Sequence, residues 1–152
     1  MIHFYFHPTP NPAKVSLFLE EAGLGPFSGQ AVHFQYAAPA GLDYAVNRYR
    51  REAERHYQVL DGHLAGRTFI VGDEYTIADM SAWGWLDRAP KVLKGATDPW
   101  ASYPNIRRWF EGIDARPAAA RARKVGSDIE FKKVNDEETR RALFPSNFPP
   151  AA

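Results

Sequence analysis

The segment Asp43–Leu64 constrains the fold more than any other part of the chain, because it carries the longest helical repeat of apolar residues. Polar and charged side chains, mostly arginine and glutamate, fill the opposite side of the same segment. This pattern predicts an amphipathic helix with one face in a core and the other in water. The apolar residues recur at intervals of three and four: Val46, Tyr49, Ala53, Tyr57, Leu60 and Leu64.

A second helix is predicted from YTIADMSAWGWL, which begins at Tyr75. Thr76 is a good N-cap residue, and Asp79, three positions later, can complete a capping box. Tyr75 and Met80 have the spacing of a hydrophobic staple. The helix is apolar nearly all round, as expected for one at the centre of a bundle. We therefore assign Thr76 and Asp79 a structural capping role rather than a catalytic one.

Further helices are predicted on both sides of this pair, which gives a body of five or six helices. Gly23–Pro26 is expected to break the chain before the first of them, and Pro90 is expected to end the central helix. His33 is predicted to be a packing residue beside Phe34. Phe144 and Phe148 are expected to hold the C-terminal tail on the bundle. The predicted helices cover Phe27–Ala37, the run from Pro104 through Ile113, a short stretch from Pro117, and Asp136–Leu143.

The stretch Ile2–Leu24 reads as a strand, a polar turn and a helix in immediate succession. Ile2, Phe4, Tyr5 and Phe6 make an almost wholly apolar run, and the prolines and asparagine that follow end the strand. Pro12 suits the first helical turn, where a missing N–H removes no hydrogen bond. Thr9 and Asn11 lie where backbone amides and the positive end of the helix dipole would meet, so this turn suits an anion.

Composition excludes several classes of function. The 152 residues are 45% hydrophobic with a formal net charge of +1, which gives no basic field for nucleic acid. No apolar run approaches the length of a membrane span, and no signal peptide is recognisable, so we expect a cytoplasmic protein without a membrane partner. His56 and His63 are two helical turns apart, and no metal site is expected. Because the sequence holds no cysteine, any sulfur chemistry requires a ligand.

Three segments together carry a resemblance to a known family. YFHPTPNPAKVSLFLEEAGL resembles the first strand and helix of bacterial glutathione transferases, specifically the Nu-class group related to disulfide-bond oxidoreductases. GPFSGQAVHFQYAAP and YTIADMSAWGWL resemble the C-terminal helical domain of the same family. The resemblance implies a mainly α fold, in which residues 1–24 are a remnant β-α unit of a thioredoxin-like domain and residues 25–152 form the helical bundle. On the order of 60 to 80 residues of the thioredoxin-like domain would be missing between them.

The resemblance also implies a chemistry. Glutathione would be the co-substrate, and the side chains of Thr9 and Asn11 would donate hydrogen bonds to its sulfur and favour the thiolate. Arg48, in AVNRYRREAERHY, matches an arginine that lies near that sulfur, although a solvated surface arginine is the alternative. The thiolate would attack an apolar electrophile or a disulfide. The protein would form a homodimer. The first strand has no evident partner within the chain, so its edge is expected to be covered, paired with another chain or exposed to solvent.

Two further interpretations remain open at this stage. The chain could be a non-catalytic helical module that binds an apolar ligand or a protein through the surface left by the missing domain. It could also be the product of an internal deletion that has inherited the family's sequence without its activity. Whether the protein is an enzyme is therefore undecided from the sequence.

Overall fold

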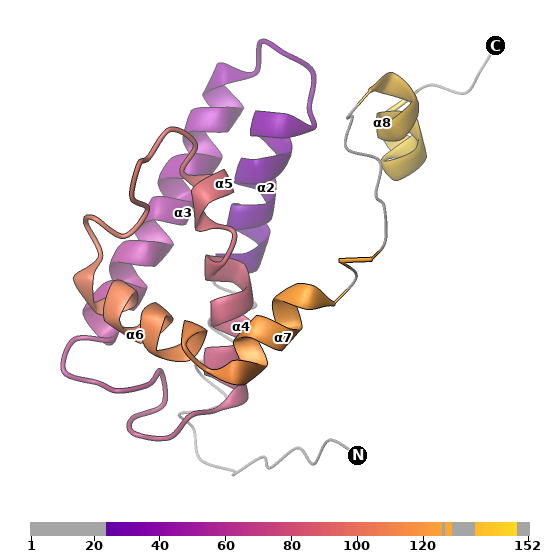
Figure 1. The fold of residues 1–152 in the computed structure, drawn as a ribbon. Coiled ribbons are helices and arrows are strands. Elements are labelled where there is room, and N and C mark those ends of the chain that lie inside the picture. Colours follow the sequence, from indigo (N-terminus) through magenta and orange to yellow (C-terminus); the bar gives the residue numbers. More distant parts are fainter. Residues whose placement is uncertain (1–23, 126, 129–135, 149–152) are drawn as a thin grey trace.

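The structure is a computed structural model, which describes residues 24–125, 127–128 and 136–148. The described part is mainly α-helical, as predicted, and α2 (Leu24–Tyr36) lies beside the long helix α3 (Asp43–His63) (Figure 1). The expected remnant strand and helix at residues 1–24 fall almost entirely outside the described residues, so that prediction stays untested. The other helices are α4 (Ile77–Leu86), α5 (Ala89–Val92), α6 (Pro104–Asp114), α7 (Pro117–Lys124), α8 (Glu137–Leu143) and the 3-10 turn η1 (Pro145–Asn147).

Helix α3 forms as its periodicity predicts, ending within one residue of the expected position. The inward side of α3 packs on α2 and α6. Tyr57, which is fully buried, meets the rings of Trp100 and Tyr103 edge-on at centroid distances of 6.1 and 5.8 Å. These aromatic contacts connect the long helix to the loop that precedes α6, and they close the core at that end.

Helices α3 and α6 also support each other's ends through polar side chains. The carboxylate of Asp61 in α3 accepts hydrogen bonds from the backbone N–H groups of Asn105 and Ile106, each at 2.9 Å. Those N–H groups have no partner within α6, so Asp61 serves as a cap supplied by a neighbouring helix. In return, the Arg108 guanidinium donates to the carbonyl of Leu64 at 2.8 Å, just after α3 ends.

Thr76 and Asp79 form a capping box at the start of α4. The Thr76 hydroxyl accepts from the N–H of Ala78, and the Asp79 carboxylate accepts from the N–H of Thr76 at 2.9 Å. Asp79 is fully buried, and its other oxygen accepts from the N–H of Ile70 at 2.9 Å and from Trp109 Nε1 at 2.8 Å. One carboxylate thus joins the 66–75 connection, α4 and α6.

Two expected helix boundaries are wrong, and proline explains both. Helix α2 already begins at Leu24, so Gly25 and Pro26 lie inside it rather than forming a break. Pro26 occupies the first turn, where the absent N–H costs no intrahelical bond. Helix α4 ends at Leu86, and Pro90 lies in the first turn of α5 instead of ending α4.

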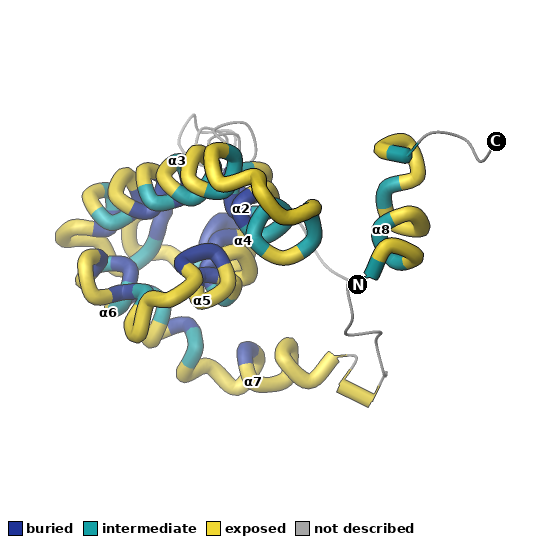
Figure 2. The backbone as a smooth tube through the Cα atoms, turned by 90° about the horizontal axis from the view of Figure 1, so that it is seen from above, coloured by how far each residue is buried: buried dark blue, intermediate teal, exposed yellow. Residues whose placement is uncertain are grey.

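The expectation that α4 is surrounded on all sides is also wrong. Its buried side faces the core, and Figure 2 shows that neighbouring α7 is exposed along most of its length. On the other side of α4, Ile77, Met80 and Trp85 are 48%, 50% and 39% exposed. An apolar helix therefore presents part of its surface to solvent, which the sequence pattern alone does not distinguish from burial.

The aromatic ring of Phe144 in the C-terminal segment contacts the bundle. Phe144 meets the ring of His33 edge-on at 4.8 Å, and His33 also packs edge-on against Phe34 at 5.2 Å. His33 is therefore a packing residue, as predicted. Phe148 lies under the guanidinium of Arg141 at 4.6 Å, so the contact that the structure gives it is within the tail itself.

Candidate functional site

The site predicted from the sequence is divided between described and undescribed residues. Thr9 and Asn11 lie outside the described residues, and their role stays a prediction. Arg48 lies on the outer side of α3, with 53% of its side chain exposed. Asp79 is fully buried in the core, where it caps α4 and is not exposed to solvent. The structure therefore does not bring Arg48 and the capping pair into one site.

Arg48 is held in place by Glu52, one helical turn further along α3. Its Nη1 lies 2.9 Å from the Glu52 carboxylate, and this hydrogen bond raises the pKa of Arg48 above its usual value. Glu52 also accepts from Arg55 at 2.7 Å, and the hydrogen bonds from Arg55 and Arg48 lower the pKa of Glu52 to about 2. A guanidinium carries five N–H donors, so Arg48 keeps donors for an anionic ligand after binding Glu52.

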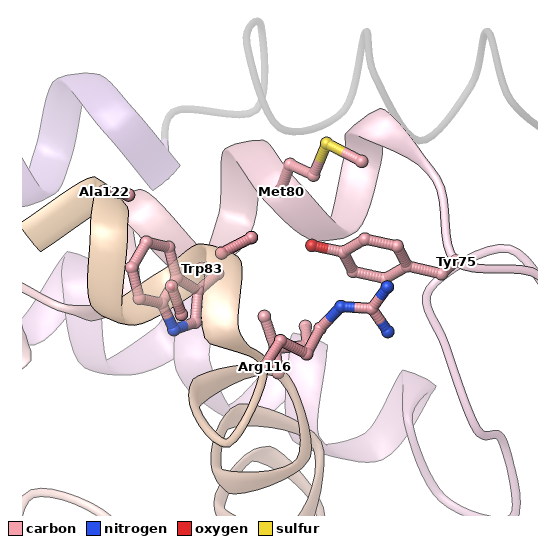
Figure 3. Close-up of a pocket in the computed structure, with 8 residues that line it drawn as sticks. Tyr75, Met80, Trp83, Arg116 and Ala122 are labelled. Atoms are coloured by element: carbon pink, nitrogen blue, oxygen red, sulfur yellow. The ribbon is translucent and has the colours of Figure 1, made fainter.

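A pocket that the sequence did not reveal lies between α4 and α7 (Figure 3). Its volume is about 450 Å³, within the range typical of small-molecule sites. Met80 and the ring of Tyr75 face the space from one side, and Trp83 and Ala122 border it from the other (Figure 3). The lining residues are Tyr75, Met80, Trp83, Ile113, Arg116, Ala118, Ala119 and Ala122.

Two arginines stack on the aromatic residues that line this pocket, and they differ in whether a carboxylate neutralises them. The Arg123 guanidinium lies 5.1 Å from the ring centroid of Trp83 and is paired with the Asp87 carboxylate at 2.5 Å. The Arg116 guanidinium lies 4.0 Å from the ring centroid of Tyr75. Within the described ranges, no carboxylate forms an ion pair with Arg116. The pocket therefore contains one positive charge that the described part of the protein does not neutralise.

Two further hydrogen-bond donors belong to the pocket's aromatic walls. Trp83 Nε1 is buried and has no hydrogen-bond partner in the described part of the chain. Burial raises the pKa of Tyr75, which keeps the phenol protonated and able to donate at neutral pH. The hydroxyl of Tyr75 points toward the space beside Met80 (Figure 3). Because Trp83 Nε1 is buried, the donor that reaches the pocket is the Tyr75 hydroxyl.

Sequence reasoning missed this pocket because its two walls come from segments about 40 residues apart. The sequence predicts Tyr75 and Met80 only as a staple, and it assigns no role to Arg116. The one usable signal was the pair of arginines that flank the alanine-rich stretch after Pro117.

In the described ranges, no three histidine, aspartate or glutamate side chains are grouped as metal ligands. None of the described helices has the length and apolar character needed to span a bilayer.

Comparison with known proteins identifies the helical region. Residues 43–112 match the family described as "Glutathione S-transferase, C-terminal domain". Disulfide-bond oxidoreductase YghU of Escherichia coli is 42% identical over 109 residues, which are 68% of this chain and 37% of that protein. Disulfide-bond oxidoreductase YfcG of the same organism is 38% identical over 106 residues, 70% of this chain and 47% of that protein. The chain thus spans less than half the length of either relative.

Solved structures resemble the fold at lower sequence identity. The glutathione transferase URE2P6 of Phanerochaete chrysosporium, solved with oxidized glutathione, superposes with a TM-score of 0.71 at 28% identity, over 82% of this chain and 57% of that one. A glutathione transferase homologue of Lodderomyces elongisporus, solved with two GSH per subunit, gives a TM-score of 0.70 at 30% identity. That match covers 80% of this chain and 57% of the other.

Proposed function

The helical part of this chain belongs to the glutathione S-transferase family, and from that membership we propose that the protein binds glutathione and uses its thiolate as a nucleophile or reductant. Two of its relatives are named disulfide-bond oxidoreductases, and several similar structures were solved with glutathione. Those names and ligands support the proposal. The chain spans less than half the length of these two relatives. Their activity is therefore only proposed for this chain, whereas the fold is shared.

The proposed mechanism gives each predicted residue one task. Thr9 and Asn11 donate hydrogen bonds to the glutathione sulfur, which stabilises the thiolate relative to the thiol. Arg48 supplies a positive charge near the same sulfur and lowers its pKa further. One pKa unit corresponds to about 1.4 kcal/mol, so modest interactions of this kind raise the thiolate fraction at neutral pH considerably.

For an electrophile, the thiolate forms a carbon–sulfur bond as the leaving group departs with its electron pair. For a disulfide, the thiolate attacks one sulfur, forms a mixed disulfide and releases the other sulfur as a thiolate. A second glutathione thiolate then attacks the mixed disulfide, which gives oxidized glutathione and the second reduced thiol. Because these 152 residues contain no cysteine, both reducing equivalents come from glutathione. A relative with two GSH per subunit fits that requirement.

The observation that carries the proposal is the position of Arg48. Its guanidinium is anchored by Glu52 yet half exposed on the outer side of α3. An anchored cation loses little side-chain freedom when it binds an anion, which favours binding. A second arginine, Arg55, binds the same carboxylate and is 56% exposed. Arg55 therefore provides a matched control for any effect of Arg48.

The test is titration calorimetry of the protein with reduced glutathione, beside variants at the proposed site. We expect a dissociation constant in the micromolar to low-millimolar range. This corresponds to a binding free energy on the order of −4 to −8 kcal/mol. Thr9→Ala, Asn11→Ala and Arg48→Ala should each weaken binding several-fold, whereas Arg55→Ala should not. Turnover is then measured with 1-chloro-2,4-dinitrobenzene and with bis(2-hydroxyethyl) disulfide, which separates the two reaction types.

Equal effects of Arg48→Ala and Arg55→Ala would contradict the role of Arg48, because both changes remove one ion pair with Glu52. No heat at 10 mM glutathione, from protein with an intact helical circular dichroism spectrum, would contradict glutathione binding altogether. The outcome then favours a second candidate function, a non-catalytic module that binds an apolar ligand or a protein. The exposed apolar side chains of α4 and the neighbouring pocket favour this alternative.

We also propose that the protein is a cytoplasmic homodimer. Tyr44 at the start of α3 is 84% exposed, and Tyr36 at the end of α2 is 44% exposed. Exposed aromatic residues of this size are enriched at protein–protein interfaces. Analytical ultracentrifugation at micromolar concentration should give twice the mass of one chain. A sedimentation profile of a single monomer across the range would overturn the proposal.

A further inference from the structure

We propose that the pocket between α4 and α7 binds a flat aromatic carboxylate or a similar apolar anion, whose charged group pairs with Arg116. This site goes beyond the glutathione function, because it lies on α4 and α7 rather than beside Arg48 on α3. It requires neither glutathione nor the residues before Leu24. Its success or failure is therefore independent of the function proposed above.

The shape of the pocket suits a two-ring molecule. A volume of about 450 Å³ leaves room for a naphthalene-sized body together with its polar substituent. The wall supplied by α7 consists of the small side chains Ala118, Ala119 and Ala122, so a ring can approach the helix closely. The opposite wall is formed by Met80, whose flexible thioether adapts to aromatic surfaces.

The aromatic walls explain the preference for a flat ligand. Tyr75 and Trp83 present ring surfaces to the same space (Figure 3). Aromatic pairs gain stability beyond area burial when they stack offset or edge-on. The ring of Trp83 stacks with Phe110 at a centroid distance of 6.3 Å and lies 5.1 Å from the Arg123 guanidinium, so contacts within the protein fix it in place.

The charge of the pocket explains the preference for an anion. Arg116 stacks on Tyr75 and has no carboxylate partner among the residues described, whereas Arg123 is paired with Asp87 and Asp114. Arg123, which is neutralised, does not line the pocket, whereas Arg116 does. Arg116 also precedes the first turn of α7, where no side chain caps the helix, so the helix dipole adds to the positive potential.

Tyr75 supplies a donor for the ligand's polar group. Its hydroxyl points toward the space beside Met80 (Figure 3). Burial raises the pKa of Tyr75, so the phenol stays protonated and can donate at neutral pH. An apolar body with one anionic or acceptor group therefore matches the walls, the cation and the phenol donor together.

The test uses three probes of one shape and different charge: 2-naphthoate, 2-naphthamide and 2-naphthylmethylammonium. Each is titrated into the purified chain by calorimetry. We expect 2-naphthoate to bind with a dissociation constant on the order of 0.1 mM, which is reasonable for a ligand of this size. The neutral amide should bind about tenfold more weakly, and the cation should not bind measurably.

Two variants locate the binding. Arg116→Gln should weaken 2-naphthoate about tenfold and leave the amide unchanged, whereas Arg121→Gln, an exposed arginine of the same helix outside the pocket, should change neither. Ala122→Leu should fill the pocket and abolish binding of both probes. Ala120→Leu is its control, because Ala120 lies on the same helix and does not line the pocket.

Equal affinity for all three probes would overturn the role of Arg116. Naphthoate binding that survives Ala122→Leu, in protein with unchanged circular dichroism, would place the ligand elsewhere and overturn the site. Absence of binding to 5 mM 2-naphthoate would do the same. Glutathione titration of Arg116→Gln should match that of the unaltered protein, which keeps this test separate from the test of the glutathione site.

Discussion

The polar junction of α3, α4 and α6 and the pocket between α4 and α7 use similar residue types in opposite ways. At the junction, Asp79 accepts hydrogen bonds from Ile70, Thr76 and Trp109, and Asp61 caps α6. In the pocket, Trp83 keeps an unpaired N–H, and an arginine stacks on a ring with no carboxylate opposite.

The difference between the two tryptophans shows this most directly. Trp109 Nε1 donates to Asp79 at 2.8 Å, whereas Trp83 Nε1, on the adjacent helix, has no acceptor in the described ranges. Buried polar groups in a structural core are normally satisfied, because an unpaired one costs stability. The indole N–H of Trp83 is therefore left unsatisfied beside the pocket, whereas that of Trp109 stabilises the junction. The following predictions test that distinction.

Replacement of Asp79 should give the largest effect. Asp79→Ala removes the acceptor of two backbone N–H groups and the Trp109 indole, and it leaves the N–H groups of Ile70 and Trp109 buried without a partner. We expect a loss of about 3 to 5 kcal/mol in unfolding free energy, measured by urea denaturation. Asp73→Ala, at an exposed carboxylate that accepts from Thr68, is the control and should cost under about 0.5 kcal/mol. Similar losses for both variants would contradict the junction's role.

Leucine substitutions at two alanines compare the stability cost of added volume in the closed core and in the open pocket. Ala82 of α4 is fully buried in the core, whereas Ala122 borders the pocket and is exposed. Ala82→Leu should cost about 2 to 3 kcal/mol, because the extra methylenes have no space. Ala122→Leu should change stability by less than about 0.5 kcal/mol, since leucine fills an existing cavity on a helix surface. Equal costs in thermal unfolding would show that the pocket is not open.

Loss of the cap on α6 should give a smaller effect. Asp61→Ala leaves the N–H groups of Asn105 and Ile106 without their acceptor, and we expect a cost of about 1 to 2 kcal/mol. Glu111→Ala removes an exposed carboxylate from the same helix and is the control. The measurement is the midpoint urea concentration of unfolding, compared between proteins whose unfolding free energy depends on urea with the same slope. A loss from Asp61→Ala no greater than that of the control would mean that water replaces the cap.

The elements with strong local signals could be predicted from the sequence. The period of α3 and the capping pair Thr76 and Asp79 each depend on residues within a few positions of one another. The start of α2 could not be predicted, because Gly25 and Pro26 are tolerated in a helix only where the first turn and the tertiary contacts allow it. A built Cβ at Gly25 would lie 2.9 Å from the ring of Trp85, so this glycine serves a packing contact that local rules do not reveal.

The sites show the same limit more strongly. Arg48 was found through a family motif, and its anchor Glu52 follows from helical spacing. The pocket depends on how Arg116 and Tyr75 meet across α4 and α7, which no local pattern encodes. In the same way, Asp79 was predicted as a cap, but its bond to Trp109, thirty positions away, required the fold.

Glu52 is an intermediate case, a fully paired carboxylate near the surface, and its pH dependence gives the smallest effect. Hydrogen bonds from Arg55 and Arg48 lower its pKa from 4.5 to about 2. Between these two values the unfolded chain binds more protons, so the stabilisation is present above pH 4.5 and is lost as the pH falls to about 2. The arginines are half exposed, which limits the contribution to about 1 kcal/mol.

The unfolding free energy of the unaltered protein should therefore exceed that of Glu52→Gln by about 1 kcal/mol at pH 7, and the difference should shrink between pH 5 and pH 2.5. Comparing the two proteins at each pH cancels the contribution of Asp98, whose pKa is also lowered, by the N–H of Trp100 and by Arg107. A difference that stays constant from pH 7 to pH 3 would mean that Glu52 stabilises α3 without its charge. The anchoring of Arg48, and with it the preorganisation of the proposed glutathione site, would then rest on helix packing instead of on the ion pair.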